Sequence, residues 1–466
     1  MINLDLVSSC KSVLREFKGS GLYHFCTDSR KYEEPGVFIA IPGEKVNPLN
    51  LISSLLEASC PYVFFQDSEL NRTIVDELKL KYPKTNFIAL SDSITFLQEI
   101  SHLHIREWKT KNTSNKVFAI AGSNGKTTHK EMLSHLLNSA LPGKVISTEK
   151  NYNNHLGVPF TLLNVNDQTE IVVLELGSSS PGEMKVLCDI AEPDFGITTN
   201  IGATHLEFFP GGEAQVFEEE SFVYSAVSNH TKGEGLFFIN YDDEYLKTLK
   251  PTKGSITYGE SQNAMAVIKL NDSGAEAVLK NEIYSATNGH ITGRHNKMNL
   301  ITCLLIASNI YPEHKNTFTK ACKDFRPTRN RSEWIEFEGK QVYLDAYNAN
   351  PSSMKAALIG FKDSIKDKGI SLDLACVVVG DMYELGEKTP EYHRDLGKFV
   401  QDQGFKNVYF VGRFANHYLE GYPTAQGRAS ALAFKAEYRN ECLKKHEIHF
   451  IKGSRSLQLE SLFDIR

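Results

Sequence analysis

Hydrophobic positions along the chain gather in short runs rich in valine, isoleucine, leucine and phenylalanine, and most runs end in glycine and polar residues. Such runs predict strands buried on both faces, because a half-exposed strand would alternate apolar and polar side chains. Amphipathic stretches at residues 51–59 and 92–108 predict helices. The alternation predicts an α/β fold with mostly parallel sheets. The predicted strands cover residues 37–41, 62–65, 117–121, 171–176, 195–199, 341–344, 374–379, 407–411 and 448–452, and residues 235–258 are expected to add edge strands.

The length and the polar linkers divide the chain into three predicted domains. A chain of 466 residues is too long for one core, because a domain usually holds roughly 150 residues. Polar linkers near residues 111–115 and 325–328 set the boundaries. We therefore expect a small N-terminal α/β domain at residues 1–112, a central parallel-sheet domain at residues 113–328 and a Rossmann-like C-terminal domain at residues 329–466.

Composition and charge exclude several classes of function. Fifty-one basic and 57 acidic residues give a net charge of −6, so no overall basic field exists to hold nucleic acid or an anionic membrane. No apolar run approaches the roughly 18 residues that span a bilayer, and residues 1–20 lack the apolar centre of a signal peptide. The eight cysteines are scattered without a C-x-x-C pair, which argues against structural zinc. These features predict a cytoplasmic protein without membrane insertion.

The stretch at residues 116–135 predicts a phosphate-binding loop between a strand and a helix. Its glycines let successive backbone N–H groups face one anion, and the positive end of the following helix points at the same anion. Lys126 offers a mobile charge for the outer phosphates, and the Thr127 hydroxyl is a natural magnesium ligand. Ile120 stands where the longer form of this motif has its first glycine, so an ordinary strand-to-helix turn is the alternative. The predicted loop consists of Gly122, Ser123, Asn124, Gly125, Lys126, Thr127 and Thr128.

Two polar side chains at the ends of later strands are candidates for the same site. Glu175 interrupts an apolar run, and a charge in a buried strand is costly unless it meets a cation such as magnesium. The alternative is a strand-end carboxylate in solvent. His205 lies just beyond another strand end, where a ligand or an acid/base group would be useful. A lone histidine is, however, more often a satisfied polar residue.

Polar turns outside the central domain suggest further binding loops. Residues 27–30 place short polar side chains and Arg30 ahead of a turn, and they could hold a diphosphate or a sugar, although a capped turn with a solvent-exposed arginine fits equally well. In the predicted third domain, residues 345–352, 380–386 and 453–456 each follow a strand. Strand, glycine and polar turn in repetition are typical of a Rossmann-like sheet whose loops line one edge.

The assembled motifs resemble the Mur ligases, the ATP-dependent amide-forming enzymes of peptidoglycan synthesis. The resemblance covers essentially the whole chain, and it is strongest to the branch that joins D-alanyl-D-alanine to UDP-N-acetylmuramoyl-tripeptide. Residues 345–352, 380–386 and 452–455 point to that branch. The motifs that carry the resemblance lie at residues 122–128, 153–159, 200–207, 293–299, 345–352, 380–386 and 452–455.

The resemblance implies a chemistry and a set of site residues. ATP would lie between the central and C-terminal domains, the tripeptide carboxylate would attack its γ-phosphate, and the dipeptide amine would attack the resulting acyl phosphate. Lys126 would hold the β- and γ-phosphates, Thr127 and Glu175 would ligate a first magnesium ion, and His205 a second. The implied nucleotide contacts are Asn299 at the base, Arg331, and Asp345 at the ribose. The implied substrate contacts are Ser29, Arg30, Asn153, Asn154, Asn348, Asn350 and Ser352.

The sequence departs from the family pattern at three places. Mur ligases carry a carbamylated lysine that helps to hold the second magnesium, but Glu219 stands at that position, and no lysine occurs between Lys185 and Lys232. We expect Glu219, or a neighbouring residue, to replace the carbamate. The alternatives are a weakened site or three solvated glutamates on a helix face. Residues 178–180 and 45–49 also differ from the pattern, near the expected UDP-sugar peptide.

Three functions remain open from the sequence. The first is a working ligase of the D-alanyl-D-alanine branch, a monomer that uses ATP and Mg²⁺ and takes only small-molecule substrates. The second is a paralogue that joins a different amine to a different carboxylate, such as a folylpolyglutamate-type or cyanophycin-type ligase. The third is a nucleotide-binding module without ligase turnover, which the missing lysine makes conceivable.

Overall fold

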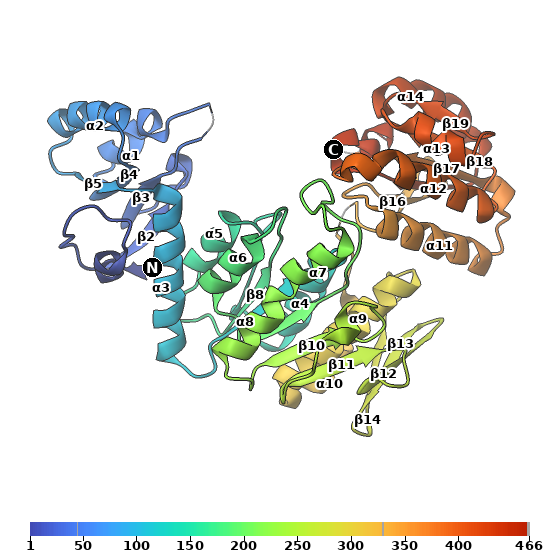
Figure 1. Cartoon of the computed structure of the whole chain (residues 1–466), viewed down its shortest axis with the longest axis horizontal. Coiled ribbons are helices and arrows are strands. Elements are labelled where there is room, and N and C mark those ends of the chain that lie inside the picture. Colours follow the sequence, from blue (N-terminus) through green and yellow to red (C-terminus); the bar gives the residue numbers. More distant parts are fainter. Residues whose placement is uncertain (44, 329, 464–466) are drawn as a thin grey trace.

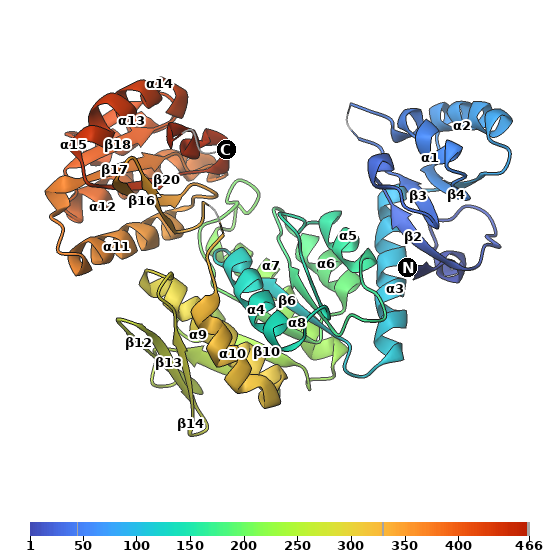
Figure 2. The ribbon, with the colours of Figure 1, turned by 180° about the vertical axis from the view of Figure 1, so that it is seen from behind.

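The computed structural model describes residues 1–43, 45–328 and 330–463, which form three α/β domains (Figure 1). The domains are arranged as an open V with the central domain at its base, and each is built on its own sheet (Figures 1 and 2). The predicted fold class, three α/β domains with mostly parallel sheets, is confirmed. The three sheets lie within residues 2–90, 116–287 and 333–452.

The N-terminal sheet has the order β1-β2-β3-β4-β5, with β1 antiparallel to an otherwise parallel sheet. The predicted strands β3 and β4 and the predicted helices α1 and α3 are confirmed. Strands β2 and β5 were not predicted, because their side chains are only partly buried and mix apolar with polar residues. The elements are β1 (Ile2–Asn3), β2 (Leu22–Cys26), β3 (Gly36–Ala40), β4 (Tyr62–Gln66), β5 (Asn86–Leu90), α1 (Ser53–Glu57), α2 (Glu69–Lys81) and α3 (Ser93–Lys111).

The central sheet has the order β14-β13-β12-β11-β10-β9-β6-β8-β7. It is parallel from β7 to β12, and β12, β13 and β14 continue it as an antiparallel meander. The strands are β6 (Lys116–Ala121), β7 (Val145–Ser147), β8 (Ile171–Glu175), β9 (Phe195–Thr198), β10 (Leu236–Asn240), β11 (Ser255–Gly259), β12 (Ala266–Asn271), β13 (Gly274–Leu279) and β14 (Glu282–Thr287). The helices are α4 (Lys126–Ala140), α5 (Gly157–Leu163), α6 (Glu183–Ala191), α7 (Glu213–Glu220), α8 (Phe222–His230), α9 (Arg294–Ile310) and α10 (Lys315–Ala321).

The prediction of edge strands at residues 235–258 is wrong. Strands β10 and β11 both have a neighbour on each side, and the edges of the sheet are β14 and β7. The three strands beyond them were missed because their signal is an alternation of buried and exposed positions, and not a continuous apolar run.

The third sheet has the order β15-β16-β20-β17-β18-β19, and only β15 is antiparallel to its neighbour. The parallel strands therefore end at one common edge, where their following loops meet. The strands are β15 (Glu333–Phe337), β16 (Lys340–Asp345), β17 (Ala375–Gly380), β18 (Asn407–Val411), β19 (Gln426–Arg428) and β20 (Ile448–Lys452). The helices are α11 (Pro351–Asp367), α12 (Thr389–Asp402), α13 (Ala415–Gly421), α14 (Ala431–Glu437) and α15 (Leu443–Lys445).

The central sheet is buried on both faces, which explains its continuous apolar strands. Along β6, Phe118 and Ile120 face one hydrophobic core, while Val117, Ala119 and Ala121 face the other. Helices α4 and α9 pack on the first face. Helices α5, α6 and α8 pack on the second, together with the end of α3 from the N-terminal domain. The strand that leads into the glycine loop is thus held from both sides.

Candidate active site at the glycine loop

The glycine loop connects β6 to α4 in a conformation that only glycines allow. Gly122 has φ +118° and Gly125 has φ +80°, both in the left-handed region. A β-carbon at Gly122 would lie 2.2 Å from the Thr199 hydroxyl oxygen, so the position also lacks space for a side chain. A β-carbon at Gly125 would lie 3.6 Å from Nδ2 of Asn299. Asn299, a predicted nucleotide contact on α9, is therefore beside the loop.

The segment after β9 holds the glycine loop in place by hydrogen bonds. Ser123 N donates to Asn200 O at 2.8 Å, and Asn124 N donates to Asn200 Oδ1 at 3.1 Å. The Thr199 hydroxyl donates to Asn124 O at 2.6 Å. These N–H groups are occupied within the protein, so the N–H groups that remain for an anion are those at the start of α4, which have no acceptor inside the helix.

Lys126 and Thr127 stand at the start of α4, where the sequence places them. The Lys126 ammonium donates a hydrogen bond to the Gly122 carbonyl oxygen, so the side chain folds back over the loop. Thr127 is 8% exposed. A cation and a hydroxyl are thus held at the positive end of the helix, where phosphate groups bind.

Glu175 is a buried carboxylate at the end of β8, beside β6. Its Oε1 accepts a 2.9 Å hydrogen bond from Asn153 Nδ2, while its buried Oε2 has no hydrogen-bond partner among the described residues. An unpartnered buried carboxylate oxygen is costly unless a cation or a donor meets it. The interpretation of Glu175 as a carboxylate in solvent is therefore wrong, and its free oxygen fits a Mg²⁺ ligand.

His205 and Glu384 connect the central domain to the third domain. His205 Nδ1 lies 2.6 Å from Glu384 Oε2, and Glu207 N donates to Glu384 O at 3.1 Å. This close contact with His205 lowers the pKa of Glu384 below its usual value. Glu384 lies within residues 380–386, a motif that the sequence indicated, but only the structure shows that it reaches His205.

The two glutamates at the end of α7 have different tasks. The interpretation of this stretch as solvated glutamates is wrong for both, because Glu219 and Glu220 are each 4% exposed. Glu219 accepts hydrogen bonds from Gly182 N at 2.8 Å and Met184 N at 2.6 Å, so its two oxygens hold the first turn of α6. Glu220 Oε2 accepts a 2.6 Å hydrogen bond from Gly122 N. The carboxylate that faces the glycine loop is therefore that of Glu220.

The electrostatics of Glu220 follow from its position. Burial raises the pKa of Glu220, whereas the Lys126 charge and the hydrogen bond from Gly122 act in the opposite direction. Glu219, as a like charge, raises this pKa further, and His205 lowers it. Glu220 thus shares the electrostatic environment of the lysine and the histidine that the sequence singled out.

No cluster of three or more His, Cys, Asp or Glu side chains is preformed for a metal within residues 1–43, 45–328 and 330–463. This observation agrees with the binding mode of Mg²⁺, which usually takes one or two carboxylates and completes its shell with substrate phosphates and water. Thr127 and the free oxygen of Glu175 supply oxygen ligands of that kind.

Two side chains of the third domain touch the glycine loop directly. Asn350 Nδ2 donates to Asn124 Oδ1 at 2.6 Å, and Asn124 Nδ2 donates to the Ser352 hydroxyl oxygen at 2.9 Å. Asn350 also caps α11 through Ser353 N. The structure therefore brings these predicted substrate contacts to the loop.

The other predicted residues of the third domain lie at the same sheet edge. Lys452, 3% exposed, donates to Asp345 Oδ2 at 2.7 Å and to Asn348 O at 2.8 Å. The Arg331 guanidinium lies 3.7 Å from the centre of the Tyr347 ring. Lys452 was missed as a site residue, although its position at the end of β20 could have indicated it.

The predicted substrate turn after β7 has a supporting role in this structure. Asn153 orients Glu175 by the hydrogen bond described above and accepts one from Gly177 N through its carbonyl oxygen at 2.9 Å. Asn154 Oδ1 accepts from Leu156 N at 3.2 Å and Gly157 N at 2.9 Å, which caps the start of α5. Asn153 therefore orients Glu175, and Asn154 holds the first residues of α5.

The predicted site residues of the N-terminal domain are not brought to the loop. Arg30 donates to both oxygens of Asp28, at 2.9 and 2.8 Å, and it is exposed. This hydrogen bonding lowers the pKa of Asp28 to about 2. Ser29 begins a short 3-10 turn that Asp28 caps. The cluster is thus a capped turn with an exposed arginine.

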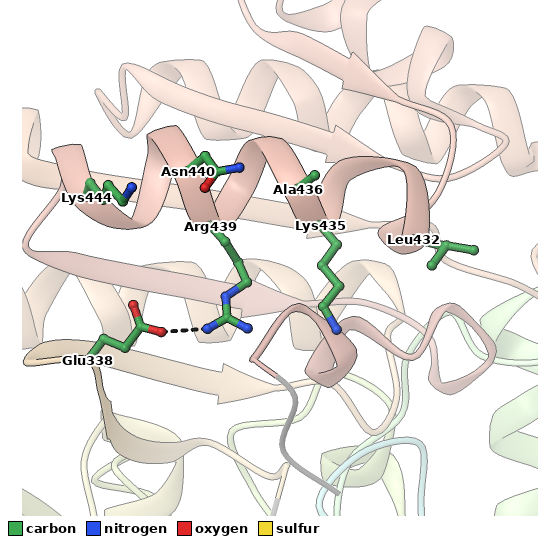
Figure 3. A pocket seen from close by; sticks show the side chains of 7 residues that line it. All are labelled: Glu338, Leu432, Lys435, Ala436, Arg439, Asn440 and Lys444. Carbon is green, nitrogen blue, oxygen red and sulfur yellow. Dashed lines mark hydrogen bonds and ion pairs between the residues drawn. The ribbon is translucent and has the colours of Figure 1, made fainter.

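Two surface hollows occur away from this site. One lies on the third domain and is lined mainly by Lys435, Ala436, Arg439 and Lys444, with Arg439 paired to Glu338 (Figure 3). The other lies at the opposite end of the central strands, beside Trp108 and Gly143. Neither hollow includes a residue of the glycine loop. In the described parts of the chain, no helix is long and apolar enough to cross a membrane.

Comparison with known proteins identifies relatives of the chain. The Mur ligase middle domain matches residues 120–307, and the Mur ligase glutamate ligase domain matches residues 330–452. UDP-N-acetylmuramoyl-tripeptide--D-alanyl-D-alanine ligase of Bacillus subtilis is 28% identical over 96% of this chain and 93% of its own length. The enzyme of the same name from Rickettsia prowazekii is 28% identical over 94% and 93%.

Solved structures show the same fold over the whole chain. MurF from Acinetobacter baumannii matches 99% of this chain and 98% of its own with a TM-score of 0.80 and 22% identity. MurF ligase from Thermotoga maritima, solved in complex with ADP, matches 99% and 97% with a TM-score of 0.77 and 22% identity.

Proposed function

The chain belongs to the Mur ligase family, and from that premise we propose that it joins D-alanyl-D-alanine to UDP-N-acetylmuramoyl-tripeptide at the expense of ATP. The relatives that match nearly the whole chain carry the name of this activity. The observation that carries the proposal is the glycine loop, with Lys126 folded over it, the free oxygen of Glu175 beside it and the third domain bound to Asn124. A nucleotide-binding module without turnover has no need of that second domain at its loop.

The first step of the proposed reaction activates the tripeptide. An oxygen of its terminal carboxylate attacks the γ-phosphorus of ATP, the bond from that phosphorus to the bridging oxygen breaks, and ADP leaves. Lys126 and the first N–H groups of α4 hold the phosphates and compensate their charge. Without that compensation, a carboxylate and a triphosphate would repel each other at bonding distance. Magnesium, when bound, supplies further positive charge across the phosphate oxygens, and Thr127 and Glu175 would hold it there.

The second step forms the amide bond. The free amine of D-alanyl-D-alanine attacks the acyl carbon, the carbon–oxygen bond to phosphate breaks, and inorganic phosphate takes up the proton that the amine loses. The dipeptide would approach from the third domain, whose loop at residues 345–352 contacts the glycine loop and whose loop at residues 380–386 contacts His205. Asn299, Arg331 and Asp345 would hold the nucleotide, and Ser29 and Arg30 the UDP end of the precursor.

We further propose that Glu220 fills the place of the carbamate that other Mur ligases build on a lysine. Glu220 is the neighbour of Glu219 that faces the loop, while Glu219 is committed to α6. A carboxylate ends in the same anionic group as a carbamate, so the site would need no carbon dioxide. Replacing the Glu220 carboxylate by an amide should lower turnover about 10- to 100-fold, because a charged partner of the loop is lost. The matched variant Glu219→Gln should affect stability more than turnover.

The experiment that tests the function is phosphate release by the purified protein. ATP, magnesium, UDP-N-acetylmuramoyl-tripeptide and D-alanyl-D-alanine are each omitted in turn, with and without bicarbonate. Turnover that requires all four, and that bicarbonate does not change, is the expected result. A marked bicarbonate requirement would contradict the role of Glu220 and leave the ligase activity standing. ATP binding without turnover of the tripeptide precursor and D-alanyl-D-alanine would refute the proposed substrates. It would favour a paralogue with different substrates or a nucleotide-binding module without ligase turnover.

We also propose that the protein works as a cytoplasmic monomer. The eight cysteines are free thiols, and the proposed substrates are small and water-soluble. Light scattering of the purified protein tests the monomer, since a dimer would double the measured mass.

A further inference from the structure

The arginines of the third domain fall into two groups. Four of the six in its described part form ion pairs with glutamates: Arg394 with Glu420, Arg428 with Glu437, Arg439 with Glu338 and Arg455 with Glu460. The other two have no such ion pair within the described residues and lie on aromatic rings, as Arg428 and Arg439 also do. Arg331 stacks on Tyr347, and Arg413 lies 4.9 Å from the ring centre of Tyr383 and 4.5 Å from that of Phe414. For these two, the described part of the chain offers no carboxylate within ion-pair distance. Arg331 belongs to the proposed nucleotide contacts, and Arg413 has no role so far.

The backbone around Arg413 is fixed by a buried carboxylate. Arg413 N donates to Asp381 Oδ2 at 2.8 Å, and Phe414 N donates to Asp381 Oδ1 at 3.1 Å. Asp381 is fully buried at the end of β17. Gly412 has φ +136°, and a β-carbon there would lie 2.3 Å from Asp381. The turn after β18 is therefore held in one conformation, and it places Arg413, which is exposed, at the surface.

The aromatic ring under Arg413 belongs to the loop that touches the central domain. Tyr383 directly precedes Glu384, whose carboxylate reaches His205. The segment of His205 is in turn bound to the glycine loop through Gly202 N and the Ser123 hydroxyl, at 2.8 Å. Arg413 thus lies against Tyr383, the residue next to the glutamate that contacts the central domain.

The geometry points to a carboxylate as the partner of Arg413. A guanidinium that lies against aromatic rings, without a carboxylate partner, keeps N–H groups for two parallel hydrogen bonds to a planar anion. In the proposed reaction, the amine donor has one free carboxylate, which an extended dipeptide carries roughly 7 Å from its reacting amine. We propose that Arg413 binds the terminal carboxylate of D-alanyl-D-alanine and so selects a dipeptide over a single amino acid. This inference rests on the proposed function.

The test compares the dipeptide with its C-terminal amide on the wild-type protein, Arg413→Gln and Arg413→Lys. The wild type should lose about 10- to 100-fold in kcat/KM on the amide, as expected for a charge-assisted contact. Arg413→Gln should process acid and amide alike, with KM for ATP and for the UDP precursor within roughly twofold of the wild type. Arg413→Lys should lie between them. The control is Arg394→Gln, an exposed arginine on α12, which should behave as the wild type.

Each outcome of this test either supports or overturns the proposed role of Arg413. If Arg413→Gln still prefers the dipeptide acid to its amide as strongly as the wild type does, the inference is overturned. The proposed ligase activity is not affected by that result. A raised KM for ATP or the UDP precursor, instead of the dipeptide, would overturn it in favour of a phosphate or stem-peptide carboxylate. Absence of wild-type turnover with the dipeptide would refute the proposed function and this inference together. If Arg413→Gln does not fold, Arg413→Lys decides by whether the preference for the acid falls.

Discussion

The central domain meets its two neighbours in different ways. On the N-terminal side, α3 runs along the central domain and is bonded to it at buried positions (Figure 1). His104 Nε2 lies 2.9 Å from Val165 O, Trp108 Nε1 donates to Thr169 O at 3.2 Å, and Ile105 and Trp108 are part of the second core of the central sheet. This interface is continuous hydrophobic core, and its buried polar groups are paired except for Nδ1 of His104, which has no hydrogen-bond partner among the described residues.

On the other side, the third domain is attached by a few partly exposed contacts. They include the contact between His205 and Glu384, the hydrogen bonds of Asn124 to Asn350 and Ser352, the 2.8 Å hydrogen bond from Trp334 Nε1 to Thr292 Oγ1, and Tyr392 packed against the apolar residues around the loop before α7. The cores of the third domain contain no residue of the central domain. Figure 2 shows the two domains facing each other through loops.

The difference between the two interfaces indicates which domain can move relative to the central domain. Separating α3 from the central domain would expose core residues, whereas separating the third domain breaks mainly polar contacts that water can replace, and Tyr392 is the apolar exception. The contacts of the third domain also lie on the glycine loop and on His205, the residues that would bind ATP and metal. Domain closure and ligand binding thus act on the same atoms, while the N-terminal domain moves with the central one.

The largest effect should come from truncating Trp108, which is 2% exposed. Trp108→Ala should lower the free energy of unfolding by about 3–5 kcal/mol, because a large cavity opens between α3 and the central domain. Urea denaturation measures this change. Leu80→Ala, at a side chain that is 87% exposed, is the control and should change stability by less than about 0.5 kcal/mol. A loss as small as the control's would mean that α3 is not part of the central core.

A smaller loss is expected at the buried ion pair of the same interface. Lys109 Nζ lies 2.8 Å from Asp194 Oδ2, and both side chains are 13% exposed. Lys109→Met should destabilise the protein by about 3 kcal/mol at neutral pH, because the buried Asp194 carboxylate loses its nearest cation and keeps only Lys116 at 3.9 Å. The control on the same helix is Lys111→Met, whose exposed pair with Asp167 should contribute at most about 1 kcal/mol.

The pH dependence of the Lys109 variant checks the same interface. Burial lowers the pKa of Lys109 more than Asp194 raises it, so the folded pKa lies below that of the unfolded chain. Between these two values the unfolded state binds more protons, and stability therefore rises with pH. The wild type should gain stability relative to Lys109→Met as pH rises through this window. If the stability of the wild type and of Lys109→Met changed with pH in the same way, the pKa of Lys109 would not be lowered in the folded protein.

The contrast between the interfaces also marks what the sequence could predict. The loop from Gly122 to Thr128 was predictable, because an apolar strand, two glycines and a helix start are adjacent in the chain. The partner of Gly122 was not, since Glu220 lies 98 residues away and its neighbour Glu219 has the same chemistry. One position along α7 decides which carboxylate faces the loop. Likewise, the sequence could not predict the hydrogen bond from Asn153 to Glu175, and Asn153 stays a predicted substrate contact.

At the third-domain interface, the ion pair should affect arrangement more than stability. Glu384→Gln keeps the shape of the side chain and removes its charge. The free energy of unfolding should change by less than about 1 kcal/mol, because the pair is partly exposed. The ligand-free protein should, however, sample more open arrangements, seen as a larger radius of gyration in X-ray scattering. Glu387→Gln, in the same loop, is the control. A loss of stability comparable to that of Trp108→Ala would contradict the distinction between the two interfaces.

The smallest effect is expected from the hydrogen bond between Asn124 and Ser352. Ser352→Ala removes one hydroxyl, and a single hydrogen bond contributes about 0.5–1.5 kcal/mol, which is roughly a 2- to 10-fold change in the closing equilibrium. Fluorescence energy transfer between labels in the central and third domains measures that equilibrium, and Ser371→Ala, at an exposed cap of the third domain, is the control. If Ser352→Ala leaves the equilibrium unchanged while Glu384→Gln opens the protein, the Ser352 hydrogen bond does not help to hold the third domain. If both shift it, the glycine loop itself takes part in holding the third domain.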